Sequence, residues 1–192
     1  MKKSILFILL LALATVCLSG CVKIIDKGTE GQYTGEVAFD AAADSSSDWA
    51  QIVEEITGNA QELSAVIESG IPGAGAAVSG TGTVTEFVSK ASGKKNSLII
   101  TLENGAAVEM QIGSIYSGTA IRDLQTLKAF GSFTDQSEWS AYAKALNAEM
   151  DAQVVQPLGL DESVQGKTIS FVGAATASGG AVTITPISIT IE

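Results

Sequence analysis

From Gly82 onward, apolar and polar residues alternate in several separate segments, and this alternation restricts the possible folds more than any other feature of the chain. Successive side chains of a strand point to opposite faces, so the pattern is typical of strands that bury one face. Asn104-Gly105 is a strong hairpin-turn signal, and Pro186 shifts the last alternation by one residue, as a bulge or an edge strand would. The sequence therefore predicts strands at Thr83–Val88, Ser97–Leu102, Ala106–Ile112, Gly166–Ala174 and Ala181–Ile191.

Two other regions have the three- and four-residue spacing of amphipathic helices. In Ala41–Ser69 the apolar positions are Trp49, Val53, Ile56, Ala60, Leu63 and Ile67. Gly58 interrupts this region, and Asn59 with Glu62 has the spacing of a capping box, so one long helix and two short helices both fit. Asp135–Val155 is predicted as a helix with Asp135 and Glu138 at its start and Pro157 after its end. Its apolar face is expected to contain Trp139, Ala143, Leu146, Met150 and Val154.

Three strands, a helix and two strands follow one another in the order of an OB barrel. We therefore predict an α+β fold, a five-stranded OB-like antiparallel β-barrel with a helix between strands three and four and an N-terminal helical segment packed against it. A plain antiparallel sheet with helices on one face fits the same pattern. The glycine-rich residues Gly70–Gly82 are expected to form a loop or hinge.

The N-terminus has the features of a secretory signal. Lys2-Lys3 precedes an apolar run, Ile5–Val16, that is too short for a comfortable membrane span. The run closes with Leu18-Ser19-Gly20-Cys21, which resembles the bacterial lipobox, and this resemblance implies lipidation of Cys21 and cleavage just before it. The predicted divisions are a signal peptide at 1–20, a flexible tether at 21–36 and a single domain at 37–192 that includes helices at 41–69.

The composition excludes several kinds of chemistry. The chain has no His, and processing removes Cys17 and blocks Cys21, so Ser-His-Asp, Cys-His and histidine-ligated metal sites are excluded. Loss of Lys2 and Lys3 takes the formal charge from −10 to −12, because residues 1–20 contain no acid. Such a chain is repelled by nucleic acid and by anionic lipids. We expect no nucleic-acid partner, and the membrane is expected to be contacted through the acyl chains on Cys21.

Val108–Asp123 contains the most distinctive candidate position, because Arg122 is the only arginine of the chain. It follows a strand and a turn with Gly113, Gly118 and Thr119. Arg122 is expected either to lock this turn by pairing with an acid or with carbonyls, which we favour, or to contact a ligand or partner carboxylate at the barrel mouth. Asp123 is not expected to be its simple partner, because adjacent residues do not face each other on a regular element.

Other candidate sites are less distinctive. Asp40–Asp48 and Asp161-Glu162 are rich in acids but lack EF-hand spacing, so solvated helix caps are the favoured explanation. No catalytic residue, metal site or cofactor is predicted. Trp49 and Trp139 are expected to pack in the core rather than to stack on a sugar. A pair of carboxylates for glycoside hydrolysis cannot be chosen among 21 acids.

Several short segments together resemble a family of predicted periplasmic lipoproteins of unknown function. The matching residues are Gln111-Ile112-Gly113, Gly118-Thr119-Ala120 with Arg122-Asp123, Phe133-Thr134 with Gln136, Ala145-Leu146-Asn147, Gly166-Lys167-Thr168, Phe171 and Gly173-Ala174. The resemblance implies an OB-like lipoprotein whose genes often lie beside sugar ABC-transport genes.

The function hypothesis that follows is a non-enzymatic accessory protein, exported and lipid-anchored at the cell envelope. It is expected to bind a partner or small solute, with a sugar-transport component as a candidate partner. A carboxylate-dependent glycan hydrolase and a purely structural envelope protein are the alternatives.

Overall fold

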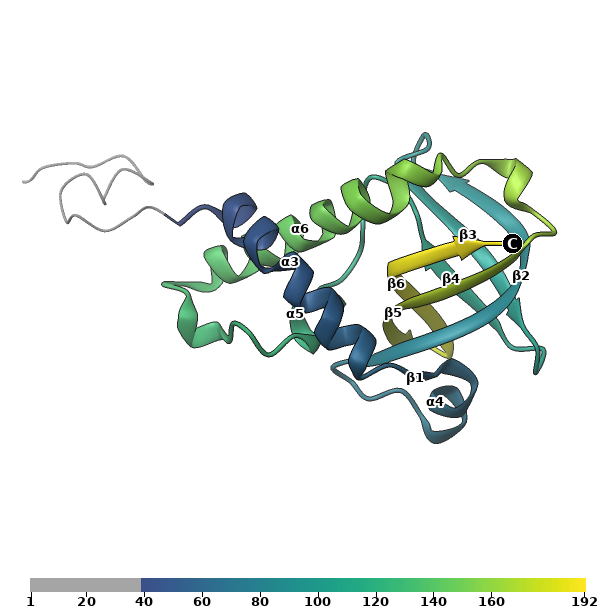
Figure 1. Ribbon diagram of the computed structural model, residues 1–192, viewed down its shortest axis with the longest axis horizontal. Helices are drawn as coiled ribbons and strands as arrows, with labels where there is room; N and C mark the ends of the chain where they lie inside the picture. The colour runs from purple at the N-terminus through teal and green to yellow at the C-terminus, as the bar shows by residue number, and fades with distance from the viewer. Residues whose placement is uncertain (1–38) are drawn as a thin grey trace, which may run out of the picture. The chain divides into compact units, whose positions relative to one another are not determined.

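Five strands close into a β-barrel in the computed structural model, which describes residues 39–192 (Figure 1). They pair in the order β2-β3-β4-β6-β5, and β2 also pairs with β5, which closes the barrel. Their bounds are β2 (Ala76–Lys90), β3 (Lys95–Leu102), β4 (Ala107–Gln111), β5 (Thr168–Ser178) and β6 (Ala181–Ile191). The predicted OB-like barrel is confirmed, and the predicted signal peptide, Cys21 and the tether lie outside the described residues.

One pairing of the barrel differs from the antiparallel expectation. Strands β4 and β6 run parallel, with Glu109 opposite Thr183 and Met110 opposite Ile184. Parallel neighbours need a long crossover connection, and here the helices between β4 and β5 provide it. The other four contacts of the barrel are antiparallel.

Strand β2 is longer than predicted, because residues 76–82 belong to it and not to a loop. Its first part, Ala76–Thr83, pairs with β5, and its second part, from Gly82 onward, pairs with β3. A Cβ atom on Gly82 would lie only 2.6 Å from the Thr101 carbonyl oxygen. Glycine in this region therefore permits close approach of two strands, and the loop is limited to residues 70–75.

The N-terminal region forms two helices separated by a short strand. They are α3 (Ala41–Gly58), β1 (Gln61–Glu62) and α4 (Leu63–Ser69). The predicted capping box at Asn59 is wrong: Asn59 ends α3, and the residue that caps α4 is Glu62, whose carboxylate accepts a hydrogen bond from the Ala65 amide. A carboxylate at a helix start satisfies an amide that has no partner within the helix.

The connection between β4 and β5 contains several helical segments. It contains α5 (Ala120–Leu124), a 3₁₀ turn η1 (Phe130–Ser132), α6 (Gln136–Met150), a π-helical turn η2 (Asp151–Val155), and the 3₁₀ turns η3 (Gln156–Leu158) and η4 (Glu162–Val164).

The helix predicted to end at Val155 begins at the expected cap and stays helical to Val155, but its last turn, η2, is a π turn. Asp135 accepts hydrogen bonds from the Ser137 and Glu138 amides, which confirms its role as the cap. At the other end the π turn advances the phase by one residue, so that Val155 is buried in place of the predicted Val154.

The apolar core lies inside the barrel and continues between α3, α5 and α6 at one end of it (Figure 1). Trp49 on α3 is 5% exposed, which confirms that it packs in the core. The largest fully buried side chains are Tyr142, Ile52, Ile56, Leu63, Leu98, Ile100, Met110, Ile121, Leu146, Met150, Ile169 and Ile184.

A polar cluster around Lys128 joins the two long helices. The Lys128 ammonium lies 2.9 Å from the Asp44 carboxylate and 2.8 Å from that of Asp48, and both acids are on α3. The Tyr142 hydroxyl on α6 donates a 2.8 Å hydrogen bond to Asp48. Asp40, by contrast, caps α3 as expected. The solvated-cap explanation is therefore wrong for Asp44 and Asp48, which hold a cation.

This cluster makes the fold sensitive to alkaline pH. Burial and the hydrogen bond to Asp48 raise the pKa of Tyr142 above its ordinary value of 10.0. Partial burial alone would lower the pKa of Lys128, but its hydrogen bonds to Asp48 and Asp44 outweigh it and raise this pKa above 10.5. Because both pKa values are higher in the folded state, the cluster stabilises the fold at any pH below the ordinary pKa values of 10.0 and 10.5. This stabilisation is lost as pH rises through the folded-state pKa values.

We expect the free energy of unfolding, measured by urea titration, to fall as pH rises above about 10. Lys128→Met should lower stability at pH 8 and make the alkaline fall shallower. Lys144→Met removes an exposed lysine from α6 and is the matched control. Equal behaviour of the two variants, or a flat profile up to pH 11.5, would contradict this assignment.

Candidate functional site

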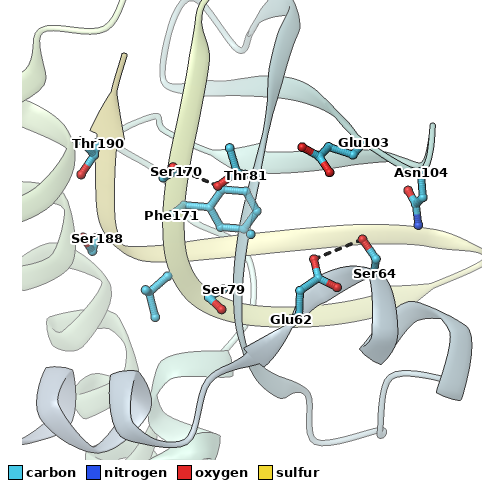
Figure 2. Close-up of a pocket in the computed structure, with 12 residues that line it drawn as sticks. Glu62, Ser64, Ser79, Thr81, Glu103, Asn104, Ser170, Phe171, Ser188 and Thr190 are labelled. Atoms are coloured by element: carbon cyan, nitrogen blue, oxygen red, sulfur yellow. Dashed lines mark hydrogen bonds between the residues drawn. The ribbon is translucent and has the colours of Figure 1, made fainter.

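An open groove of about 920 Å³ lies on the outside of the barrel, along β2, β5 and β6. We call it the barrel groove. Short strand β1, the start of α4 and the turn after β3 border it (Figure 2). Its lining residues are Glu62, Ser64, Ser79, Gly80, Thr81, Glu103, Asn104, Ser170, Phe171, Val172, Ser188 and Thr190.

Two rows of outward side chains cross the three strands, and we call them the hydroxyl rows. The strand registers place Thr81, Ser170 and Thr190 side by side, followed by Ser79, Val172 and Ser188. The Thr81 and Ser170 hydroxyl oxygens are 2.9 Å apart and hydrogen-bonded. Neighbouring strands lie about 4.8 Å apart, so the rows present closely spaced donors and acceptors to a ligand.

Two carboxylates border the groove at the same edge of β2. Figure 2 shows both on one side of the hydroxyl rows, with Glu103 and Asn104 above Glu62 and Ser64. The Glu62 carboxylate accepts hydrogen bonds from the Ala65 amide at 3.0 Å and from the Ser64 hydroxyl at 3.2 Å. Among the described residues, Glu103 has neither a hydrogen bond nor an ion pair through its carboxylate, and its side chain is exposed.

The Phe171 ring lies beneath the groove, against the backbone of β2. A Cβ atom on residue 80 would lie 2.9 Å from the ring carbon Cζ, so Gly80 leaves the space that the ring occupies. The ring itself is 3% exposed. The ring therefore packs in the core beneath the groove, and the groove itself is mainly polar.

This arrangement suits recognition of a polar solute by hydrogen bonds. Hydroxyls, an amide and carboxylates line the groove, and none of its lining residues is Lys or Arg. An anionic ligand would meet no cation there. The sequence analysis missed this site because its residues come from five elements far apart in the chain. The signal that could have found it is the recurrence of Ser and Thr at alternate strand positions.

The residues predicted as a site lie elsewhere, at the junction of α5 and α6. The Arg122 guanidinium donates through Nε at 2.8 Å and Nη2 at 2.6 Å to Asp123 Oδ1. Its Cζ lies 4.2 Å from the centroid of the Trp139 ring, and Nη1 donates to the Trp139 carbonyl. The expectation that Asp123 is not its partner is wrong, because the long arginine side chain folds back over the neighbouring residue on this short helix.

The other predicted residues shape the connection that precedes α5. A Cβ atom on Gly113 would lie 2.4 Å from the Lys94 carbonyl oxygen, and Gly118 has a positive φ of 90°. Thr119 precedes α5, and its hydroxyl donates to Asp123. Trp139 is only half-buried and packs against Phe133 at 5.0 Å.

Two residues that the sequence analysis did not single out hold this connection. The side-chain amide of Gln111 accepts a hydrogen bond from the Ser117 amide at 2.7 Å and donates one to the Ser117 carbonyl. It thus satisfies both backbone groups of Ser117, as the peptide group of an adjacent strand would. Tyr116 donates a 2.6 Å hydrogen bond to the buried Asp151 in the π turn. Burial and this bond raise the pKa of Tyr116 above its ordinary range.

Within residues 39–192, no group of three or more acids converges as a metal site would require. In the same part of the chain, none of the helices combines the length and hydrophobicity of a membrane span. Asp161 caps the turn η4 through the Ser163 amide, which lowers the pKa of its carboxyl group.

We expect Arg122→Ala to lower the free energy of unfolding by roughly 1–3 kcal/mol, because the cation–π contact and the ion pair are lost from a side chain that is 11% exposed. Urea titration measures this loss. Solute binding in the barrel groove should be unchanged, since Arg122 does not line it. Unchanged stability together with abolished binding would instead favour the ligand-contact interpretation.

Comparisons with known proteins agree with this architecture. An OB-fold protein from Thermotoga maritima has a similar crystal structure, with a TM-score of 0.59, 13% sequence identity, and coverage of 81% of this chain and 100% of that chain. At this identity the likeness shows the fold alone. Two OBody proteins, each solved bound to hen egg-white lysozyme, cover 61% of this chain and 93% and 78% of their own. Their TM-scores are 0.32 and 0.31 and their identities 18% and 19%.

A comparison with curated proteins finds no match. The family model described as "Predicted periplasmic lipoprotein (DUF2291)" matches residues 73–190. The matched region covers more than half of the chain and includes all five strands of the barrel. The chain therefore belongs to this family of predicted periplasmic lipoproteins.

Proposed function

We propose that this protein is a lipid-anchored, non-enzymatic accessory protein of the cell envelope that binds a small polar solute in the barrel groove. The family supports an exported, envelope-associated location. The lipobox-like Leu18-Ser19-Gly20-Cys21 supports anchoring through Cys21. The groove supports the binding role.

The observation that carries the proposal is the pair of hydroxyl rows. Small-molecule sites use a few fixed polar groups to orient a ligand. Here the strands hold the polar groups in a fixed array, so a ligand loses little free energy in ordering them. A polyhydroxylated solute of sugar size matches the spacing of these groups and fits within the groove of about 920 Å³.

The two carboxylates keep the glycan hydrolase as a second candidate. Glycoside hydrolysis needs one acid and one base or nucleophile on either side of the bond. Glu62 and Glu103 both border the groove at one edge of β2, but the Glu62 carboxylate is engaged in capping α4. We therefore favour binding without turnover, and the hydrolase predicts release of reducing sugar that Glu103→Gln abolishes.

The link with sugar uptake rests on the resemblance described above, in which related genes often lie beside sugar ABC-transport genes. A solute-binding lipoprotein on the outer side of a membrane would present sugar close to such a transporter. We propose a transport component as the partner.

Anchoring predicts a change of location. Cys21→Ser should move the protein from the membrane fraction to the soluble exported fraction, because the residue that accepts the acyl chains is gone. Fractionation with immunodetection measures this, and Cys17→Ser is the matched control that should stay with membranes. Continued membrane retention of Cys21→Ser would refute lipidation at this position.

Solute binding predicts a ligand-dependent rise in melting temperature of the native, detergent-solubilised protein with at least one of glucose, galactose, xylose, ribose or glucosamine. Ser188→Trp should abolish the rise by filling the groove. Ser89→Trp, at an exposed strand position outside the groove, should keep it. No rise with any of these sugars would contradict the proposed function.

A further inference from the structure

The barrel groove has a gap in the paired edge of β2. On that edge, β1 pairs with Val78 and Ser79, and β3 pairs with β2 from Gly82 onward. Gly80 and Thr81 lie between the two and pair only with β5 on the opposite edge. The described part of the chain thus has a strand edge open for two residues, in the centre of the groove.

The hydrogen-bond alternation of the strand shows which groups face the gap. The Val84 amide donates to the Lys167 carbonyl, and the Val84 carbonyl accepts from Gly166, so both groups face β5. In an antiparallel pair the peptide groups of alternate residues face alternate sides. Gly80 therefore faces β5. The N–H of Thr81 faces the gap, whereas its C=O is directed at the Glu103 amide, as the Gly82–Leu102 pairing requires.

The charges around this gap have one sign. Glu103 borders it from the turn after β3, and Glu62 borders it from the start of α4. Glu62 already accepts two hydrogen bonds, whereas among the described residues Glu103 has no partner. A carboxylate without a partner at the wall of a polar groove favours a cationic donor, because charge-assisted hydrogen bonds are the stronger ones.

We propose that this gap binds an amino sugar. The ammonium group pairs with Glu103, and the ring hydroxyls bond to the Thr81 N–H and to the neighbouring side chains of the hydroxyl rows. Two unpaired residues span about 7 Å of strand, which accommodates one sugar ring rather than an extended peptide. This inference rests on the proposed function, since it assigns the ligand class of the same groove.

The test compares glucosamine, glucose and glucuronate by calorimetric titration of the native protein at pH 6, where the amine of glucosamine is protonated. Glucosamine should bind at least about tenfold tighter than glucose, and glucuronate should bind more weakly than glucose. Glu103→Gln should remove the advantage of glucosamine over glucose. Glu54→Gln removes the same charge from an exposed position on α3 and should change neither affinity.

Amide hydrogen exchange gives a readout that needs no substitution. In the free protein the Thr81 amide should exchange at least about tenfold faster than the Gly80 amide, and glucosamine should slow it. A protected Thr81 amide in the free protein would overturn the gap. Binding of glucose at equal or higher affinity than glucosamine would overturn the amino-sugar assignment but leave the proposed function standing, whereas absence of all binding would remove both.

Discussion

The barrel depends on one strand that pairs along both of its edges. Strand β2 contributes its first half to β5 and its second half to β3, and no other pairing joins the two ends of the sheet. Such a strand must bend while it stays paired, and Gly82 permits this because its lack of a side chain lets the Thr101 carbonyl approach. The candidate site arises from the same constraint. As the edge of β2 passes from β1 to β3, Gly80 and Thr81 pair only with β5 on the opposite edge, and the groove lies over them.

The sequence predicted those parts of the fold that bury one face against another. Strand β6 was predicted with its observed bounds, and Pro186 does mark a register shift, because the pairing with β5 skips Ile187 between Pro186 and Ser188. The first half of β2 was missed because Ala76, Ala77 and Gly80 lack the contrast between apolar and polar residues that reveals a strand. The phase change in η2 was missed for a different reason, since a π turn depends on packing and not on local spacing.

The candidate site was less predictable than the fold. Arg122 attracted attention because it is unique, but a single arginine in an acidic chain has many internal carboxylates to pair with, and it pairs with its neighbour. Lys128 forms a comparable cluster and has no distinctive sequence context. The groove residues become neighbours only through strand register, which single-residue features do not encode. The side-chain alternation of Thr81, Ser170 and Ser188 was visible, but ordinary solvated strands show the same pattern.

The location of the groove also follows from what covers the rest of the barrel. OB folds commonly bind ligands on the face of their second and third strands, which correspond here to β3 and β4. In this chain the connection after β4 lies against the start of β3, where the Ile115 amide donates to the Lys94 carbonyl. Gln111 on that face is engaged with Ser117, and Ser97 is 3% exposed. Because the connection after β4 occupies this face, the groove along β2, β5 and β6 is the surface that a ligand can reach. The hydroxyl rows line this groove, and the Glu103 carboxylate borders it.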